Sequence, residues 1–184
     1  MKKTVLFIGL LFSVYLLPGQ EKPEGLFISS KYKFNKSLQI NCDKKTIFNT
    51  IDDLSTWKTW SAWSVENDPK IVITYGDKES GSGAMMFWKG KKMGKGEIKI
   101  TNTDPYKEII LSAIFNKGVF KMDFNIQLEE IKENEILVKW IVSGKTRRGA
   151  FAKILGRMLP KWMGKDIETS LKVLKHLCEG NLDN

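Results

Sequence analysis

The segment VFKMDFNIQL, residues 119–128, decides the fold class of this chain. Apolar and polar side chains alternate along it, with Met122, Phe124, Ile126 and Leu128 on one face and Asp123, Asn125 and Gln127 on the other. Successive side chains of a strand point to opposite faces of the sheet. This segment therefore predicts a β-strand with one buried face and one face in water.

Segments on both sides of 119–128 have the composition of further strands. They are residues 33–40, 71–75, 84–88, 93–101, 109–115 and 136–142. Several end at a glycine or at Asp104-Pro105, which are typical turn residues. Short, hairpin-like connections join antiparallel neighbours, so we expect an antiparallel sheet of six or seven strands.

Two parts of the sequence change to a helical period. Asp43 suits an N-cap, and the apolar residues that follow it predict a short helix: Ile47, Phe48, Ile51 and Leu54. A longer stripe near the C-terminus predicts one long helix: Met163, Ile167, Leu171, Leu174 and Cys178. Pro160 interrupts the wider apolar pattern, which predicts a kink or a break near residues 156–160. A sheet whose apolar face is covered by one long helix is an α+β architecture.

The chain of 184 residues is the length of one domain. It begins with Lys2 and Lys3 and an apolar run over residues 5–17, as in a secretory signal. As a helix this run spans about 20 Å, less than the ~30 Å hydrocarbon core of a bilayer. We expect a signal or anchor at 1–19, a linker at 20–31 and the domain at 32–180.

The first segment has three interpretations. Cleavage after Gly19 would put bulky Leu17 where a small residue is expected, so an uncleaved anchor stays open beside a cleaved signal. With Lys2 and Lys3 remaining inside, both interpretations place the domain outside the cytoplasm. A buried N-terminal helix is the third interpretation, and the absence of a polar face argues against it.

Only two cysteines occur, Cys42 and Cys178, and they form no CxxC motif. In an exported chain they could pair as a disulfide across a long loop. The alternative is two isolated, buried thiols.

Catalytic motifs are scarce in this sequence. A single histidine, His176, excludes any scheme that needs two, and its place off the apolar stripe predicts a surface position. No nucleotide-binding, zinc-protease or calcium-loop motif is present, and the glycines at 81–83 and 94–96 suit turns between strands. We therefore assign no catalytic residue, metal site or cofactor. An enzyme would depend on a carboxylate or a tyrosine such as Asp68, Tyr75 or Asp123.

Large, soft side chains come from many of the predicted elements. Core packing is the simplest explanation for any one of them, but together they suit an apolar cavity between the sheet and the helix. The expected lining residues are Trp60, Trp63, Tyr75, Met86, Trp88, Phe124, Trp140, Trp162, Met163 and Ile167.

The net charge of +9 is unevenly distributed. Nine basic residues against two acidic ones fall between Lys145 and Lys175, and a second cluster comprises Lys89, Lys91, Lys92 and Lys95. Basic residues beside Trp162 suit an anionic membrane surface, and the expected contacts are Lys153, Arg157, Lys161 and Lys165. A solvated helix face and a nucleic-acid surface are the alternatives. Export argues against nucleic acid as the partner.

A set of short motifs resembles the START/Bet v1-like (SRPBCC) superfamily, in particular its bacterial polyketide cyclase/dehydrase and lipid-transport-like proteins. The motifs are Phe34 to Ile40, Ile51-Asp52-Asp53-Leu54, the W-x-x-W-S-x-W segment from Trp57 to Trp63, Asp68-Pro69, Trp88-x-Gly90, Gly94-x-Gly96 and Gly164-x-Asp166-Ile167-Glu168. The sequence departs from the family at Ala62, where proline is usual. The resemblance implies a helix-grip fold: seven curved antiparallel strands around a long C-terminal helix, two short helices after the first strand, and a cavity between.

Members of that superfamily range from lipid carriers to cyclases and hydrolases, so fold alone does not transfer an activity. Our leading hypothesis is non-catalytic binding of a hydrophobic or amphipathic, lipid-like small molecule in the cavity, at or outside the cytoplasmic membrane. A cyclase- or hydrolase-like enzyme is the alternative. A protein-interaction module is the third hypothesis, and the oligomeric state stays open.

Overall fold

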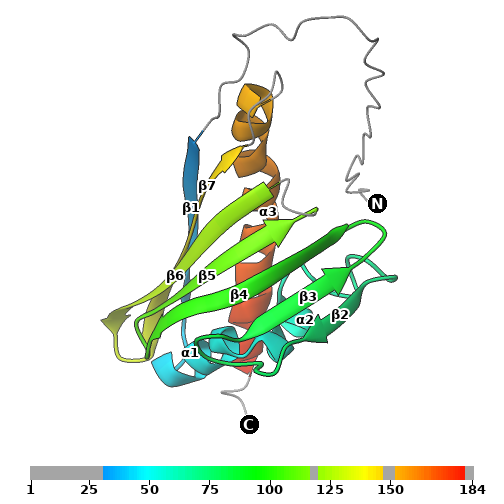
Figure 1. Cartoon of the computed structure of the whole chain (residues 1–184). Coiled ribbons are helices and arrows are strands. Elements are labelled where there is room, and N and C mark those ends of the chain that lie inside the picture. The colour runs from blue at the N-terminus through cyan, green and yellow to red at the C-terminus, as the bar shows by residue number, and fades with distance from the viewer. Residues whose placement is uncertain (1–30, 117–119, 147–151, 181–184) are drawn as a thin grey trace, which may run out of the picture.

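The computed structural model describes residues 31–116, 120–146 and 152–180 of the chain. Seven strands form one antiparallel sheet in the order β1-β7-β6-β5-β4-β3-β2 (Figure 1). Their bounds are β1 Lys31–Ile40, β2 Val72–Tyr75, β3 Met85–Lys89, β4 Lys95–Asp104, β5 Glu108–Phe115, β6 Phe120–Lys132 and β7 Glu135–Thr146. From β2 to β7 each strand pairs with the next along the chain, and β1 closes the sheet beside β7.

The alternation that predicted β6 is confirmed. Met122, Phe124, Ile126 and Leu128 are buried, whereas Lys121 and Asp123 are exposed. Phe124 stands opposite Leu111 of β5 and Val142 of β7, and these side chains are also buried. Because the register aligns the apolar positions of neighbouring strands, they form one continuous concave face.

β6 and β7 extend beyond the segments that periodicity predicts. β6 continues through Glu129, Glu130 and Ile131 to Lys132, all exposed, and Asn134 makes the turn with φ at +56°. The hairpin leaves the core there, so its side chains carry no inward and outward pattern. Hydrophobic periodicity therefore does not detect this part of the strands.

The long helix α3, Ala152–Gly180, lies across the concave face (Figure 1). The predicted stripe is confirmed at Ile167, Leu171, Leu174 and Cys178, which are all buried, while Met163 is half-buried. The helix continues through Pro160, so the predicted interruption is not a break in the helix.

Contacts between α3 and β1 fix the direction of the helix. Gly164 packs against Phe34 and Lys36, and the Lys36 ammonium lies 3.2 Å from the carboxylate of Glu168. Farther along, the Lys175 ammonium donates to the Gln39 carbonyl at 2.9 Å. The helix and β1 therefore run in the same direction, with the start of each at one end of the domain and the C-terminal turn of α3 at the other.

Two short helices follow β1, as expected: α1, Lys44–Asp52, and α2, Trp57–Trp60, joined through the 3-10 turn η1, Leu54–Thr56. The Asp43 carboxylate accepts from the backbone N–H groups of Lys45 and Thr46, which confirms the predicted N-cap. Ile47, Phe48 and Ile51 are the buried face of α1. The helices lie at the end of the sheet where α3 finishes (Figure 1).

Candidate ligand-binding site

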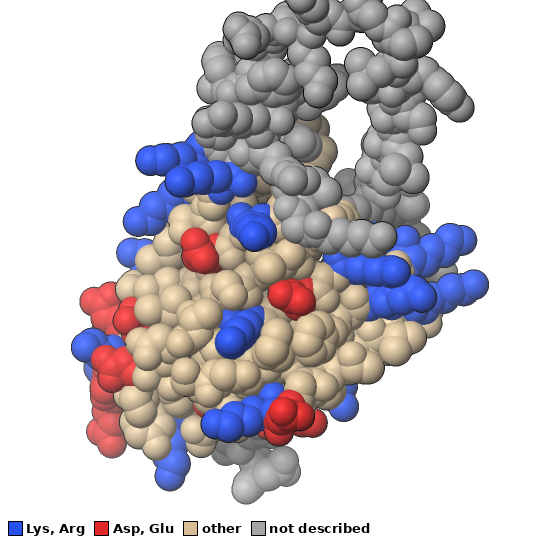
Figure 2. All heavy atoms as spheres, viewed as in Figure 1, with Lys and Arg blue, Asp and Glu red and all other residues tan. Residues whose placement is uncertain are grey.

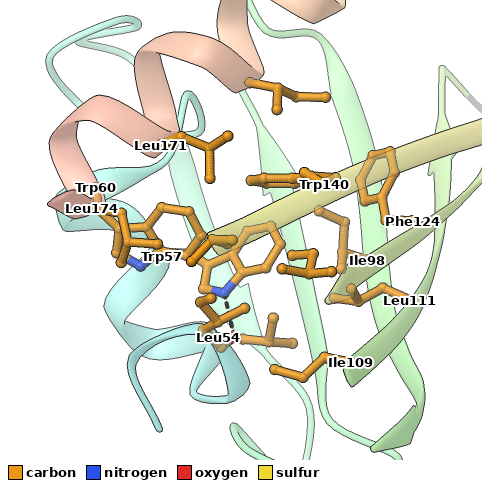
Figure 3. Close-up of a cluster of buried hydrophobic side chains, with 14 of the residues drawn as sticks. Leu54, Trp57, Trp60, Ile98, Ile109, Leu111, Phe124, Trp140, Leu171 and Leu174 are labelled. Atoms are coloured by element: carbon orange, nitrogen blue, oxygen red, sulfur yellow. Dashed lines mark hydrogen bonds between the residues drawn. The ribbon is translucent and has the colours of Figure 1, made fainter. Parts of the chain in front are cut away.

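An aromatic cluster fills the space between the short helices and the sheet (Figure 3). The ring centroid of Trp57 lies 5.0 Å from that of Trp60 and 5.6 Å from that of Trp140. Phe124 adds an edge contact to Trp140 at 5.7 Å. Such distances suit offset and edge-to-face aromatic packing. The three tryptophans therefore form one tightly packed unit rather than separate core residues.

A second group of rings continues the cluster toward β3 and β5. The Trp63 ring lies 5.7 Å from that of Trp88, and the Trp88 ring lies 5.2 Å from that of Phe115. The Trp63 ring is also 6.4 Å from that of Phe124, which joins the two groups. The W-x-x-W-S-x-W segment thus connects the short helices to rings from four strands.

Most of the predicted lining residues come together in this interior. Those that are buried are Trp60, Trp63, Met86, Trp88, Phe124, Trp140 and Ile167, and those that pack against the core half-buried are Tyr75 and Met163. Trp162 does not join them, because it is 51% exposed. Its position on α3 falls outside the inward stripe that Ile167 and Leu171 define, and it shares an outer face with Met158.

Trp140 differs from its neighbours in its hydrogen bonding. The indole N–H groups of Trp57, Trp60 and Trp88 donate to the Ile51 carbonyl, the Thr56 hydroxyl and the Met93 carbonyl. The buried Nε1 of Trp140 has no hydrogen-bond partner among the described residues. Buried polar groups are nearly always paired, so an unpaired one needs a particular explanation.

Tyr32 is the second unpaired group on the same concave face. Its side chain is buried, and its Oη has no partner among the residues that the structure describes. Burial, and to a smaller extent the charge of Asp123, raises the pKa of the phenol to about 12, so it is neutral at physiological pH. The hydroxyl lies over Gly144, the residue opposite Tyr32 on β7, where a Cβ atom would collide with it.

Sequence reasoning missed Tyr32. The available signal was the alternation of Tyr32, Phe34 and Lys36 in front of Leu38, together with a glycine two residues after Val142. Trp140, Val142 and Gly144 face inward on β7, and Tyr32 and Phe34 are their inward neighbours on β1. The two unpaired groups therefore flank an apolar stretch of the face.

The candidate catalytic groups have different surroundings. The buried Asp68 carboxylate accepts from the backbone N–H groups of Lys92 at 2.6 Å, Met93 at 3.0 Å and Lys70 at 3.2 Å. Burial acts to raise its pKa, but these hydrogen bonds outweigh it and lower the pKa. Asp68 therefore serves as an anion that ties the turn at Pro69 to the β3–β4 loop, not as an acid or base.

Asp123 and Tyr75 are also poorly placed for proton transfer inside the fold. Asp123 is exposed on the outer face of β6, opposite Ser143. The half-buried Tyr75 hydroxyl donates to the Ser55 carbonyl at 3.5 Å, and burial, with Glu79 and Asp53 nearby, raises its pKa. His176 is exposed, as predicted.

Asp166 is a carboxylate that sequence reasoning did not select. Burial raises its pKa above the usual value near 3.8, and Lys165 partly offsets this. Asp166 lies one turn before Ser170, whose hydroxyl accepts from the Ala62 N–H at 2.9 Å. Asp166 is thus on the side of α3 that faces the segment after α2, as the i, i+4 spacing requires.

Comparison with known proteins shows which fold this chain shares with solved structures. No family model and no curated protein sequence matches this chain. Among solved structures, SA2116 from Staphylococcus aureus superposes with a TM-score of 0.67 at 8% identity, covering 85% of this chain and 98% of that one. The di-domain ARO/CYC StfQ from the steffimycin biosynthetic pathway gives 0.64 at 9% identity, with 84% of this chain and 52% of that chain covered. The Aha1 dimer from Colwellia psychrerythraea gives 0.53 at 18% identity, over 80% and 96%.

The fold is Bet v1-like. The seven-stranded sheet, the two short helices and the long C-terminal helix are the helix-grip arrangement that the sequence motifs implied. In the described parts of this Bet v1-like domain, no helix is long and apolar enough to span a bilayer. No group of three or more potential metal-ligating side chains occurs there either.

Charge separates along the long axis of the Bet v1-like domain. Figure 2 shows the outer face of the sheet, with basic side chains at the right near the β3–β4 loop and at the upper left, and with most of the acidic ones at the lower left near the β6–β7 hairpin, where a few basic ones lie among them. The exposed basic residues of the loop are Lys89, Lys91, Lys92 and Lys95, and the acidic residues of the hairpin include Glu129, Glu130 and Glu133. The domain therefore has a basic end and an acidic end.

The same basic end includes the start of β1. Lys31, Lys145 and Lys121 stand directly opposite one another on β1, β7 and β6. All three are exposed, and within the described residues none forms a salt bridge. Like charges held opposite each other destabilise a sheet, so this row has a cost unless an anion offsets it.

Proposed function

We propose that this protein binds a small amphipathic, lipid-like molecule between the concave face of the sheet and α3, without chemical conversion. One observation carries the proposal: Trp140 Nε1 and Tyr32 Oη are buried without partners among the described residues, and the inward residues between them, Phe34 and Val142, are apolar. Ligand sites typically combine apolar walls with a few polar groups that orient the ligand. Both groups can donate a hydrogen bond, so the matching polar part of the ligand is an acceptor such as a carbonyl, hydroxyl, ether or carboxylate oxygen.

A difference in burial along the concave face supports entry of the molecule from the basic end. Toward the α1 end, inward residues such as Ile40, Ile109 and Ile136 are almost completely buried. Toward the basic end, the apolar residues Phe34, Phe115, Phe120 and Met163 are only partly buried. Exposed apolar surface at one end favours entry there, with the apolar chain of the ligand covering these side chains.

Native mass spectrometry of the purified full chain, followed by organic extraction, tests this proposal. We expect a co-purified molecule that is released on extraction, and a lower bound fraction in Tyr32→Phe and Trp140→Phe. Tyr75→Phe is the matched control, because its hydroxyl is paired with Ser55. A consistently empty protein would contradict the proposal, as would equal occupancy in all three variants.

We also propose that the basic end faces an anionic membrane surface. The row of Lys31, Lys121 and Lys145 lies at this end, and the exposed side chains of Met158 and Trp162 lie beside Lys161 and Lys165 on α3. Lysines next to an exposed tryptophan are typical of interfacial binding. The side chains of Lys153 and Arg157, also expected at this surface, lie outside the described residues.

The position of Lys31 supports the same orientation. The apolar segment 1–19 and most of the linker 20–31 precede β1 and lie outside the described residues, and the chain enters the sheet at Lys31, at the basic end. An uncleaved N-terminal anchor would hold this end nearest to the outer side of the membrane, whereas a cleaved signal would deliver the domain to that side without fixing its orientation. Each lysine near an anionic surface contributes about 1 kcal/mol.

Vesicle sedimentation of the full chain tests the orientation. The Lys161→Glu/Lys165→Glu variant should bind phosphatidylglycerol vesicles more weakly than the wild type, and binding to phosphatidylcholine vesicles should not change. Lys107→Glu/Lys132→Glu makes the same charge change outside the basic end and serves as the control. Equal loss in both double variants would show that net charge, not a particular end, determines binding.

A cyclase- or hydrolase-like activity is the second candidate, and Asp166 is the observation that favours it. A carboxyl group with a raised pKa can hold a proton for transfer to a substrate. If the protein is an enzyme, the molecules extracted from it should include a substrate and its product. Their ratio should then shift fully to substrate in Asp166→Asn, whereas an unchanged ratio would argue against catalysis by Asp166.

A further inference from the structure

Two cysteines that are distant in the sequence meet at the end of the domain away from the basic end. Cys42 lies two residues after Ile40, the last residue of β1, and Cys178 lies in the last turn of α3. Their side chains are 2% and 1% exposed. The two buried side chains are neighbours there, and both are free thiols in the described structure.

Hydrogen bonds on both sides of the cysteines hold this arrangement. The Asn41 N–H donates to the Glu179 carboxylate at 2.8 Å, which joins the residue before Cys42 to the residue after Cys178. The Lys175 ammonium donates to the Gln39 carbonyl at 2.9 Å and to the same Glu179 carboxylate at 2.6 Å. These hydrogen bonds join the two backbones beside the thiols, and a disulfide requires such proximity.

We propose that Cys42 and Cys178 form a disulfide that links the C-terminal turn of α3 to the β1–α1 connection when the chain folds in an oxidising compartment. The inference is independent of the ligand and shares only the export hypothesis with the proposed function. Of the two alternatives in the sequence, paired cysteines or isolated thiols, the described contacts favour the pair.

The oxidant is a disulfide, such as oxidised glutathione or a thiol-disulfide oxidoreductase. The thiolate of one cysteine attacks a sulfur of that disulfide, which forms a mixed disulfide and releases one thiolate. The second cysteine, as its thiolate, then attacks the protein sulfur of the mixed disulfide and releases the other thiolate. The two protein thiols lose two protons and two electrons, and the external disulfide is reduced to two thiols.

The burial of the two thiols predicts at which stage of folding the disulfide forms. Burial and the neighbouring Cys42 raise the pKa of Cys178 to about 12, so the reactive thiolate is scarce in the folded protein. Small disulfides also have little access to side chains that are almost fully buried. Oxidation is therefore fast while the chain folds and slow once the reduced protein has folded.

The bond also changes stability through the unfolded state. It closes a loop from residue 42 to residue 178, which contains most of the domain. In the chain-entropy description, closing so long a loop raises the folding equilibrium constant by about a thousandfold. We expect a clear increase in the urea midpoint of the oxidised protein over the reduced protein.

Refolding of the full chain tests the proposal. The wild type is unfolded in urea with reductant, then refolded in a mixture of reduced and oxidised glutathione, alkylated under denaturing conditions and analysed by intact mass. We expect a product that is lighter than the reduced chain by two hydrogen atoms and takes up no alkylating agent. Peptide mapping should identify the Cys42–Cys178 link, and the reduced, folded protein should oxidise far more slowly in the same mixture.

Variants and alternative products make the outcome decisive. Cys42→Ala and Cys178→Ala each leave one thiol, which should be alkylated or carry glutathione. Two alkylated thiols, or two glutathione adducts, in the refolded wild type would overturn the proposal. A disulfide that leaves the urea midpoint unchanged would overturn the stabilising role while retaining the bond.

Discussion

Trp57 and Trp140 are neighbouring, fully buried rings with centroids 5.6 Å apart, yet they differ in a decisive way. The Trp57 indole N–H donates to the Ile51 carbonyl at 2.8 Å, and the Trp60 indole N–H donates to the Thr56 hydroxyl. The indole donors beside the short helices are therefore paired. The region around Trp140 and Tyr32 keeps two buried polar atoms without partners among the described residues. We propose Trp140 and not Trp57 as the ligand contact, because the two rings are equally buried but only the Trp140 N–H lacks a partner among the described residues.

The largest expected effect comes from a substitution in the paired region, by which we mean Trp57 and Trp60 beside the short helices. Trp60→Ala should destabilise the domain by about 3–5 kcal/mol, because it removes a buried indole and leaves a cavity beside Trp57 and Trp140. Urea unfolding followed by circular dichroism measures the change. A decrease of less than about 1 kcal/mol in the free energy of unfolding would show that the Trp60 ring lines an open space and is not tightly packed against Trp57 and Trp140.

The next effect concerns the glycine beneath Tyr32. Gly144→Ala would place a Cβ atom against the Tyr32 hydroxyl and 2.8 Å from the Lys121 carbonyl, and we expect a cost of about 1–3 kcal/mol. It should also reduce the bound fraction of the co-purified molecule by displacing Tyr32. The control is Gly180→Ala, since no atom lies within 4 Å of its Cβ position. An unchanged bound fraction of the co-purified molecule in Gly144→Ala would show that Tyr32 is not part of the ligand site.

A matched pair of substitutions tests the comparison directly. Trp57→Phe and Trp140→Phe remove the same atoms from adjacent buried rings, but only the first leaves a carbonyl, that of Ile51, without its donor. We expect Trp57→Phe to cost about 1–2 kcal/mol more in the free energy of unfolding. The co-purified molecule should be lost to a greater extent in Trp140→Phe than in Trp57→Phe. Equal costs would indicate that the Trp140 indole has a partner in the folded chain.

The smallest effect is a pH dependence. Because burial raises the pKa of Asp166, the folded state holds a proton that the unfolded state releases, and stability falls as pH rises above 3.8 toward the raised value. Asp166→Asn should remove this fall and raise stability at neutral pH by less than about 1 kcal/mol. Urea midpoints of both proteins between pH 4 and 8 measure it. Parallel curves would contradict a raised pKa.

Much of the fold could be predicted from short-range patterns. The alternation in β6 and the stripe from Ile167 to Cys178 each state which face of an element is apolar, and Asp43 states where α1 begins. Each of these patterns lies within one element, so it can be recognised without knowledge of the neighbouring elements. The exposed end of β6, from Glu129 to Lys132, was not predicted, because a segment outside the core has no such pattern.

The candidate site shows where local patterns stop. Trp162 and Met163 are adjacent aromatic and apolar residues of one helix, but only the placement of α3 on the sheet leaves Trp162 half exposed. Asp68 was a candidate catalytic carboxylate, but its shortest hydrogen bonds are with the backbone of Lys92 and Met93 on another loop. Whether a polar atom is paired depends on atoms from distant segments, so the alternation in β1 could place Tyr32 on the inward face but could not show that its hydroxyl lacks a partner.

The sequence by itself determined the α+β class, the order of the elements, the apolar faces and the excess of basic residues, because periodicity and composition are properties of the chain. Only the tertiary structure decided which apolar side chains became fully buried, which polar atoms stayed unpaired and that the lysines of three strands share one end. It alone brought Cys42 against Cys178. The physical reason is that burial, hydrogen-bond pairing and charge clustering are set by contacts between residues far apart along the chain.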